Sequence, residues 1–325
     1  MTHMRLLCNA CTAIVVVAAA VLVAASRAQA AAPFQETQSD GFYRLKLGDF
    51  EVTALLDGTS VFDAKFLKAE AMDLQRVLSK QFVQIDEIDG AVSGFVVNTG
   101  SKLILVDTGT GGFWGGNALG HLVANLKKAG YRPEQVDIVL LTHLHADHVG
   151  GLATSKGTRV FPRAVVHMAK ADSDFWLSEK IAQQAPREAQ EFFTLARSSA
   201  KPYIAAKKWS PFVGTDEIVP GVTPYPIAGH TPGHMGYLFT SKGQTMLVWG
   251  DLVHAAPVQM ERPDVGVVFD IDGPTAIKTR QDLLADLAEK GTLVAGEHMP
   301  FPSLGRLRKE GAGFVWLPVP YKARP

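Results

Sequence analysis

Three histidines and one aspartate fall within six consecutive positions, and this spacing is the strongest chemical signal in the chain. They belong to the segment Thr142-His143-Leu144-His145-Ala146-Asp147-His148, which directly follows an apolar run. Residues two apart in an extended loop point to the same side, so His143 and His145 can face one point. Asp147 and His148 can face a second point nearby as the chain turns into a helix. Imidazole and carboxylate fit zinc, with manganese, iron or cobalt as alternatives, so we predict a site for two divalent metal ions.

Two metals need more ligands than this loop supplies, and three further candidates each come shortly after a predicted strand. They are His230, Asp251 and His298. Strand ends are where α/β folds place their sites. We therefore predict two ligand sets with Asp251 as a bridge between them: His143, His145 and His230 in one, and Asp147, His148 and His298 in the other.

Strands and helices in mixed order are expected to position these residues. The apolar run 136–142 predicts a strand buried on both faces, which leads straight into His143. Two strand-rich halves argue for one layered α/β domain. The expected strands cover residues 43–57, 94–98, 102–107, 136–142, 222–227, 237–239, 245–249 and 292–295, and the expected helices cover 117–128 and 275–289.

A largely helical stretch at about residues 169–210 interrupts the strand-rich text, and we interpret it as an insertion. It contains Phe175, Trp176, Phe192 and Phe193. Aromatic residues at helical spacing usually form a core, so at least two of these four are expected to form the insertion's own core.

Residues 1–30 are predicted to be a cleaved signal peptide. A short polar stretch with Arg5 precedes the apolar segment 13–25, and Ala28-Gln29-Ala30 is an A-x-A cleavage site. The apolar segment is shorter than the ~20 residues that a membrane-spanning helix needs, which argues against a stable anchor. We therefore expect a secreted or periplasmic protein whose residues 31–325 form a single domain.

Composition narrows the chemistry further. Both cysteines, Cys8 and Cys11, lie in the predicted signal peptide, so the remaining chain has no disulfide and no thiolate ligand or nucleophile. The 325 residues are 47% hydrophobic, which excludes a disordered, collagenous or coiled-coil chain. Lys+Arg and Asp+Glu both total 32, so no basic surplus indicates a nucleic-acid partner.

Five motifs in this order resemble the metallo-β-lactamase superfamily. Besides the histidine loop they are Leu105-Val-Asp-Thr-Gly109, His230-Thr-Pro-Gly-His234, Gly250-Asp251 and Gly296-Glu-His298. The resemblance implies a four-layer αββα sandwich over about residues 42–310, with a dinuclear site at its edge and the helical insertion near that site. The two ligand sets above match the family residue by residue.

Further segments resemble a secreted branch of this family that contains methyl parathion hydrolase and related lactonases. They are residues 48–51, 174–177, 301–305 and 319–321. In this branch aromatic side chains line the substrate cleft, and the matching positions are Trp114, Trp176 and Phe192. The resemblance also implies a homodimer. Its phosphotriester specialists carry an aliphatic residue three positions after the bridging aspartate, where this chain has His254.

These residues predict a hydrolase that cleaves lactones or aryl esters with a hydroxide bridging the two metals. Asp147 would take a proton and pass it to the leaving alkoxide, and Asp251 would bridge the metals. His254 is the third predicted catalytic residue. Its imidazole can hydrogen-bond a planar carbonyl substrate and takes room that a tetrahedral phosphotriester needs. The other interpretation is that His254 packs against the insertion or orients a ligand.

Other functions remain open at this point. The same hydroxide could hydrolyse phosphotriesters of the methyl parathion type, so a small-molecule ester, lactone or phosphotriester is the expected partner. The scaffold also hosts iron-dependent redox sites in sulfur dioxygenase and flavodiiron relatives. A metal-stabilised binding protein without catalysis is the third alternative.

Two further residues are expected beside the metal ligands. Asp107 is expected to accept hydrogen bonds from the histidine loop, and His234 is expected to be a hydrogen-bonded loop histidine.

Overall fold

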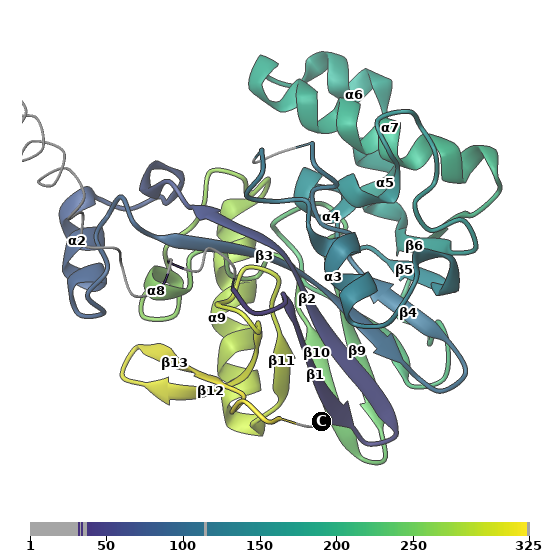
Figure 1. Cartoon of the computed structure of the whole chain (residues 1–325). Helices are drawn as coiled ribbons and strands as arrows, with labels where there is room; N and C mark the ends of the chain where they lie inside the picture. The colour runs from purple at the N-terminus through teal and green to yellow at the C-terminus, as the bar shows by residue number, and fades with distance from the viewer. Residues whose placement is uncertain (1–31, 33, 35–37, 114–115, 324–325) are drawn as a thin grey trace, which may run out of the picture. The chain divides into compact units, whose positions relative to one another are not determined.

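The computed structural model describes residues 32, 34, 38–113 and 116–323. The predicted signal peptide and Trp114 lie outside these residues. The helices and strands that are described fall in one compact unit spanning Asp40–Pro325 (Figure 1). No helix in the described ranges is both long and apolar enough to cross a membrane.

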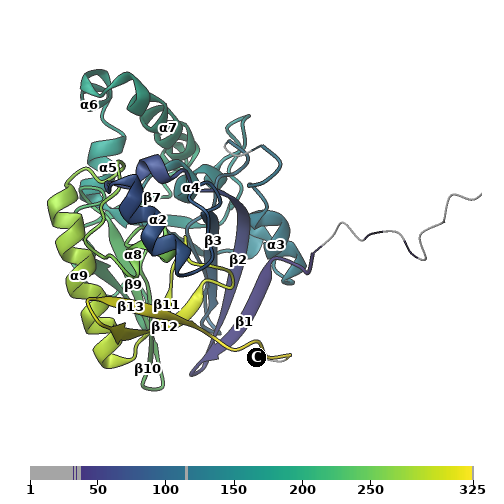
Figure 2. The ribbon, with the colours of Figure 1, turned by 90° about the vertical axis from the view of Figure 1, so that its left-hand side faces the viewer.

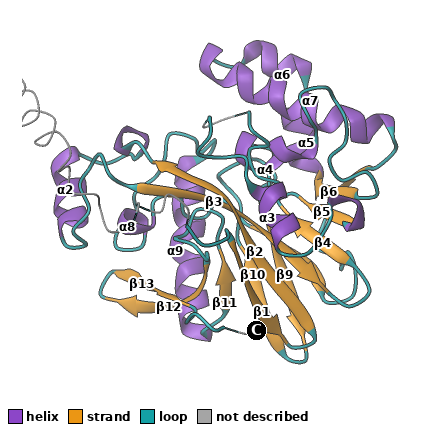
Figure 3. Cartoon of the chain, in the orientation of Figure 1, coloured by secondary structure: helices purple, strands orange, loops and turns teal. Residues whose placement is uncertain are grey.

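Two β-sheets form the inside of this unit (Figure 3). The first contains seven strands in chain order: β1 (Phe42–Leu47), β2 (Phe50–Val61), β3 (Asp89–Asn98), β4 (Leu103–Val106), β5 (Ile138–Leu140), β6 (Val165–Ala169) and β7 (Trp209–Phe212). The second has the order β13-β12-β11-β10-β9-β8. Its strands are β8 (Val222–Pro226), β9 (Met235–Ser241), β10 (Gln244–Val248), β11 (Leu293–Ala295), β12 (Leu304–Glu310) and β13 (Gly313–Pro318).

Helices lie outside the two sheets. They are α2 (Ala71–Ser79), α3 (Leu122–Lys128), α4 (Ala146–Val149), α5 (Lys170–Trp176), α6 (Glu179–Gln184), α7 (Gln190–Ala205), α8 (Ala256–Gln259) and α9 (Gly273–Lys290). Two of them, α2 and α8, pack against each other in a separate apolar cluster. The helix α9 lies on the second sheet, whereas α3, α5 and α7 pack against the first. Figures 1 and 2 both show α5, α6 and α7 together at one end of the sheets.

Three apolar cores lie between these layers. They form because successive side chains of a strand point to opposite faces of its sheet. In β3, Phe95 and Val97 face the core between the two sheets, whereas Val96 faces the helices on the other side. The opposite sheet contributes Tyr237 and Phe239 to the central core. Helix, sheet, sheet and helix therefore make the four-layer αββα sandwich that the sequence predicted.

Sequence patterns located most elements but misjudged several boundaries. The predicted single strand 43–57 is wrong, because Gly48 adopts a φ of +58° and turns the chain into a β1–β2 hairpin. A side chain at this position would meet the backbone of Ser241, its added Cβ lying 2.4 Å from that carbonyl oxygen. The helix expected from residue 117 begins at Leu122, after Gly120 with a φ of +88°.

The helical insertion is real but shorter than expected. Its helices cover residues 170–205, and Trp209 and Ser210 belong instead to strand β7, which pairs with β6. Trp176 and Phe193 are buried, but they belong to the apolar core that the helices share with the first sheet, so the expected separate core of the insertion is not found. The sequence patterns did not indicate α2, β7, β12 or β13.

One buried hydroxyl ties the two sheets together beneath the site. Tyr237 in β9 donates a hydrogen bond of 2.7 Å to the backbone carbonyl of Leu141, which follows β5. Tyr237→Phe leaves that buried carbonyl without this donor, so the free energy of unfolding should fall by about 1–3 kcal/mol. Urea denaturation measures the change. The control Tyr225→Phe removes a hydroxyl from a half-buried residue of β8 and should shift stability by less than about 0.5 kcal/mol. Equal losses in both variants would contradict this role of Tyr237.

Candidate metal centre and pocket

The residues with metal-binding chemistry meet at one edge of the sandwich. They follow the carboxyl ends of β5, β8, β10 and β11 or lie at the start of α4, as expected for an α/β fold. The structure brings together all seven predicted ligands: His143, His145, Asp147, His148, His230, Asp251 and His298.

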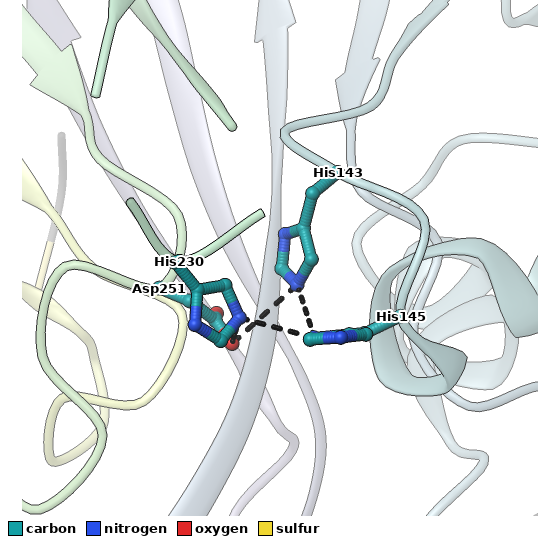
Figure 4. Close-up of side chains that lie close together, drawn as sticks. All are labelled: His143, His145, His230 and Asp251. Atoms are coloured by element: carbon teal, nitrogen blue, oxygen red, sulfur yellow. Dashed lines mark hydrogen bonds and ion pairs between the residues drawn. The ribbon is translucent and has the colours of Figure 1, made fainter. Parts of the chain in front are cut away.

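Three histidine nitrogens of the first group converge on one point (Figure 4). The Nδ1 atom of His145 lies 2.9 Å from Nε2 of His143 and 3.0 Å from Nε2 of His230. The Oδ2 atom of Asp251 completes the group at 3.5 Å from His143 and 3.2 Å from His230. Donor atoms of a tetrahedral zinc ion with bonds of 2.0–2.1 Å lie roughly 3.3 Å apart, so these separations fit such an ion.

The second group lies beside the first and shares Asp251 with it. The Oδ1 atom of Asp251 is 3.0 Å from Nε2 of both His148 and His298. The carboxylate of Asp147 approaches the same two nitrogens at 3.7 and 3.5 Å. Asp251 thus presents one oxygen to each group, which is the geometry of a bridging ligand.

The opposite ring nitrogens point their protons outward, which leaves the lone pairs for the centre. The Nδ1 atom of His148 donates to Asp107 at 2.7 Å, that of His230 to Asp270 at 2.9 Å, and that of His298 to a backbone carbonyl at 2.8 Å. Lone pairs about 3 Å apart repel unless a proton or metal ion lies between them. Nε2 of His148 and Oδ1 of Asp251 are buried with no hydrogen-bond partner among the described residues. The donor set therefore fits two divalent metal ions.

Burial keeps two of the histidines neutral. It lowers the pKa of both His143 and His145 well below the usual value, and the positive charge of neighbouring histidines lowers it further. Neutral imidazoles are the form that binds metal.

At two other histidines, neighbouring carboxylates raise the pKa instead of letting burial lower it. Burial alone would lower the pKa of His148, but the charges of Asp251 and Asp107 raise it well above the usual value. At His230, hydrogen bonds to Asp251 and Asp270 likewise outweigh burial and raise the pKa to about 9. Metal ions compete with protons for these nitrogens, so the affinity for metal should fall as the pH decreases.

Asp107 and His234 form hydrogen bonds to the predicted ligands and their loops, as the sequence predicted. Asp107 follows β4 with a φ of +55°, and its buried carboxylate accepts the backbone N–H and the hydroxyl of Thr142 as well as the proton of His148. His234 donates to the carbonyl of Ile227, and its Nε2 atom accepts the backbone N–H of Asp251 at 3.0 Å. Both residues therefore act on predicted ligands through hydrogen bonds.

Asp172, which the sequence did not indicate, fastens the two ligand loops to each other. It lies in α5, and its buried oxygens accept the backbone N–H of Leu144 at 3.0 Å and of Gly233 at 2.8 Å. Burial raises its pKa to about 6 despite these hydrogen bonds. No short motif marks this residue, because its partners lie 28 and 61 positions away.

A pocket of about 880 Å³ opens above the histidine groups. Its floor includes Asp147, Asp251 and His254, the three predicted catalytic residues. His254 is buried, its Nε2 atom lies 3.0 Å from Oδ2 of Asp251, and its ring stacks on that of His298 at 5.5 Å. His254 therefore contacts a predicted ligand and also borders the space for a substrate.

Two separate aromatic clusters form walls of this pocket. The insertion wall consists of Phe175, Trp176, Phe192 and Phe193. The ring of His145 lies 5.0 Å from that of Trp176 and 5.8 Å from that of Phe192, so these two predicted substrate-binding residues do border the centre. The second wall consists of Phe62, Phe66 and Phe269, which the sequence did not indicate.

Comparison with known proteins agrees with this geometry. Residues 88–298 match the family described as the metallo-beta-lactamase superfamily. The chain belongs to this superfamily. A crystal structure of the hydrolase AbOPH, of the beta lactamase superfamily, is 35% identical, with a TM-score of 0.83 over 88% of this chain and 100% of that one.

Three further relatives of this metallo-β-lactamase superfamily chain are lactonases. AidC, a dizinc quorum-quenching lactonase solved with a product, is 27% identical, with a TM-score of 0.80 over 87% of this chain and 98% of that one. An N-acyl homoserine lactonase from Bacillus sp is 27% identical over 173 residues, which are 48% of this chain and 60% of that protein. A second, from Bacillus cereus, is matched over 40% of its length. The chain thus spans about half the length of these curated relatives.

Removing Asp172 should loosen both ligand loops. Asp172→Ala leaves two buried backbone N–H groups unpaired, each costing about 1–3 kcal/mol, so the free energy of unfolding should fall by about 2–6 kcal/mol. Chemical denaturation is the measurement. Asp174→Ala on the same helix removes only an exposed ion pair with Lys170 and should cost less than about 0.5 kcal/mol. A loss at Asp172 no larger than that at Asp174 would rule out this anchoring role.

Proposed function

We propose that this protein hydrolyses lactones with two divalent metal ions, zinc first among them and manganese, iron or cobalt as alternatives. One observation carries the proposal: Asp251 presents one oxygen to each of two histidine groups at the floor of an apolar pocket. The similarity to the dizinc lactonase AidC and to N-acyl homoserine lactonases supports it.

Each ion would be held by one of the two groups, with Asp251 common to both. When bound, two such ions lower the pKa of a shared water toward ~7 and polarise the carbonyl oxygen of the substrate. The chain orients these donors by hydrogen bonds: Asp107 accepts from the ring of His148, and a backbone carbonyl accepts from that of His298.

Asp147 is positioned to move a proton. Its side chain is 13% exposed, the most accessible of the carboxylates around the centre, and it borders the pocket. A carboxylate there can accept a proton from the attacking water and give it to the leaving alkoxide, and a lactone needs both steps. Ring opening then leaves the protonated leaving group, now a hydroxyl, and the new carboxyl group on one product molecule.

The pocket favours a substrate with a large apolar part. Phenylalanine and tryptophan form its two aromatic walls, and its polar lining consists of the histidines and carboxylates of the centre together with Ser60, Gln184 and Glu188. Burying one CH₂ group contributes about 0.8 kcal/mol, so an acyl chain between these walls would add to binding with each carbon. A lactone with an N-linked acyl chain combines this apolar part with a carbonyl for the floor.

His254 inclines the reaction toward carbonyl substrates. Its buried ring fills space beside Asp251 that a tetrahedral phosphotriester would need. The same contact supports a role in orienting Asp251, and the two roles are compatible.

Loss of the proposed bridging carboxylate should reduce both metal binding and turnover. For Asp251→Ala, the zinc content should fall below two per chain and kcat/KM on N-acyl homoserine lactones should fall at least 100-fold, or about 2.7 kcal/mol of transition-state stabilisation. Metal analysis and lactone hydrolysis are measured on the same sample. Asp216→Asn, in an exposed loop, is the control and should match the wild type. A folded Asp251→Ala protein that lost metal and still hydrolysed lactones would refute the proposal.

A side-by-side assay separates the substrate classes. For zinc-loaded wild type, kcat/KM on an aryl lactone should exceed that on a dimethyl aryl phosphotriester by about 100-fold. Since a tenfold ratio corresponds to about 1.4 kcal/mol, this difference is about 2.7 kcal/mol of transition-state stabilisation. His254→Leu should reduce this ratio at least tenfold. The ratio serves as its own control, because a loss of metal affects both substrates. A wild-type preference for the phosphotriester would favour an organophosphate hydrolase, and bound iron with oxygen consumption on a persulfide would favour a redox enzyme.

A further inference from the structure

The geometry points to Asp270 as a positioning residue that fixes the ring of His230 for metal binding, with the buried guanidinium of Arg280 as its support. This inference rests on the proposed function, because it concerns one of the two proposed metal groups. Asp270 belongs to none of the motifs that the sequence indicated, and it lies 40 positions from His230.

The carboxylate of Asp270 is buried and shared between His230 and the backbone. Its Oδ1 atom lies 2.9 Å from Nδ1 of His230, and its Oδ2 atom accepts the backbone N–H of Val267 at 3.2 Å. A carboxylate only accepts, so Nδ1 of His230 must carry a proton, and in the neutral ring that binds metal the lone pair then lies on Nε2. That Nε2 atom is the one that converges with His143 and His145 (Figure 4).

Arg280 holds this arrangement from α9. It is 1% exposed, and its guanidinium donates to the carbonyls of Leu252, Pro263 and Val265 at 2.6, 3.2 and 2.8 Å. Its Nη2 atom lies 3.8 Å from Oδ2 of Asp270. An unpaired buried carboxylate would be costly, so a cation fixed by three carbonyls stabilises the ionised form at this position.

The backbone of the segment that follows Asp270 also hydrogen-bonds to the His230 loop. Ile271 donates its N–H to the carbonyl of His230 at 3.0 Å, and Asp272 donates to that of Gly229 at 2.9 Å. The neighbouring Phe269 belongs to the second aromatic wall of the pocket. Asp270 therefore joins one metal group, one pocket wall and α9.

The test compares three variants of the full chain by competition between the protein and a zinc chelator. Asp270→Asn keeps a hydrogen-bond acceptor but not the charge, and Asp270→Ala removes both. One of the two zinc equivalents should bind about tenfold more weakly in the Asn variant and up to 100-fold more weakly in the Ala variant, the other being unchanged. Asp272→Asn is the matched control, since Asp272 caps α9 through Thr275 and its side chain does not contact His230.

The outcomes separate this inference from the function on which it rests. A wild-type protein that binds fewer than two zinc ions would overturn the proposed function and this inference with it. Two ions in the wild type and unchanged affinities in both Asp270 variants would overturn the inference alone. Equal weakening of both ions, or weakening matched by Asp272→Asn, would show a merely structural role and also overturn it.

A crystal structure of the zinc-loaded wild type provides a check that needs no variant, should the Asp270 variants fail to fold. Zinc on Nε2 of His230, with Nδ1 within about 3.2 Å of the Asp270 carboxylate, is the expected result. Zinc on Nδ1, or Asp270 turned away from the ring, would overturn the inference.

Discussion

A buried carboxylate surrounded by imidazoles is the interaction on which the rest of this structure depends. Five histidine rings approach Asp251 at 3.0–3.5 Å. Burial alone would raise its pKa, but the histidines around it, His148 and His298 foremost, hold that pKa well below the usual range. An ionised group in the interior is tolerated only when its partners are held in place, so the surrounding chain must hold each ring.

Both sheets and α9 contribute to that rigidity. Asp107 follows β4 in the first sheet, whereas Asp270 is braced by Arg280 from the helix that covers the second. Asp172 and Tyr237 then link segments of one half to the other. The polar groups behind the site and the apolar cores between the layers thus support the same edge of the sandwich.

The proposed metal ligands could be predicted from the sequence because residue type and spacing along the chain mark them. Four of the seven proposed ligands lie in one loop, and the other three follow apolar strands, so type and spacing were sufficient to group them. Residues brought in by tertiary structure carried no such signal. Phe62 and Phe66 reach the pocket from beyond the end of β2, and Asp270 joins His230 across 40 positions. The strand β7 has four residues, one of them Pro211, and is only partly buried, which makes its pattern weak.

The two aromatic walls differ in how freely they can change. The insertion wall comes from helices that carry none of the proposed metal ligands. Substitutions there can alter the shape offered to a substrate while leaving the chemistry on the floor intact, which is the separation that divergent evolution or directed evolution exploits. Phe269 stands next to Asp270, which accepts a hydrogen bond from the proposed metal ligand His230, so the second wall is tied to one of the two histidine groups. New substrate ranges should therefore arise mainly through α6 and α7, because α5 also carries Asp172, which anchors both ligand loops.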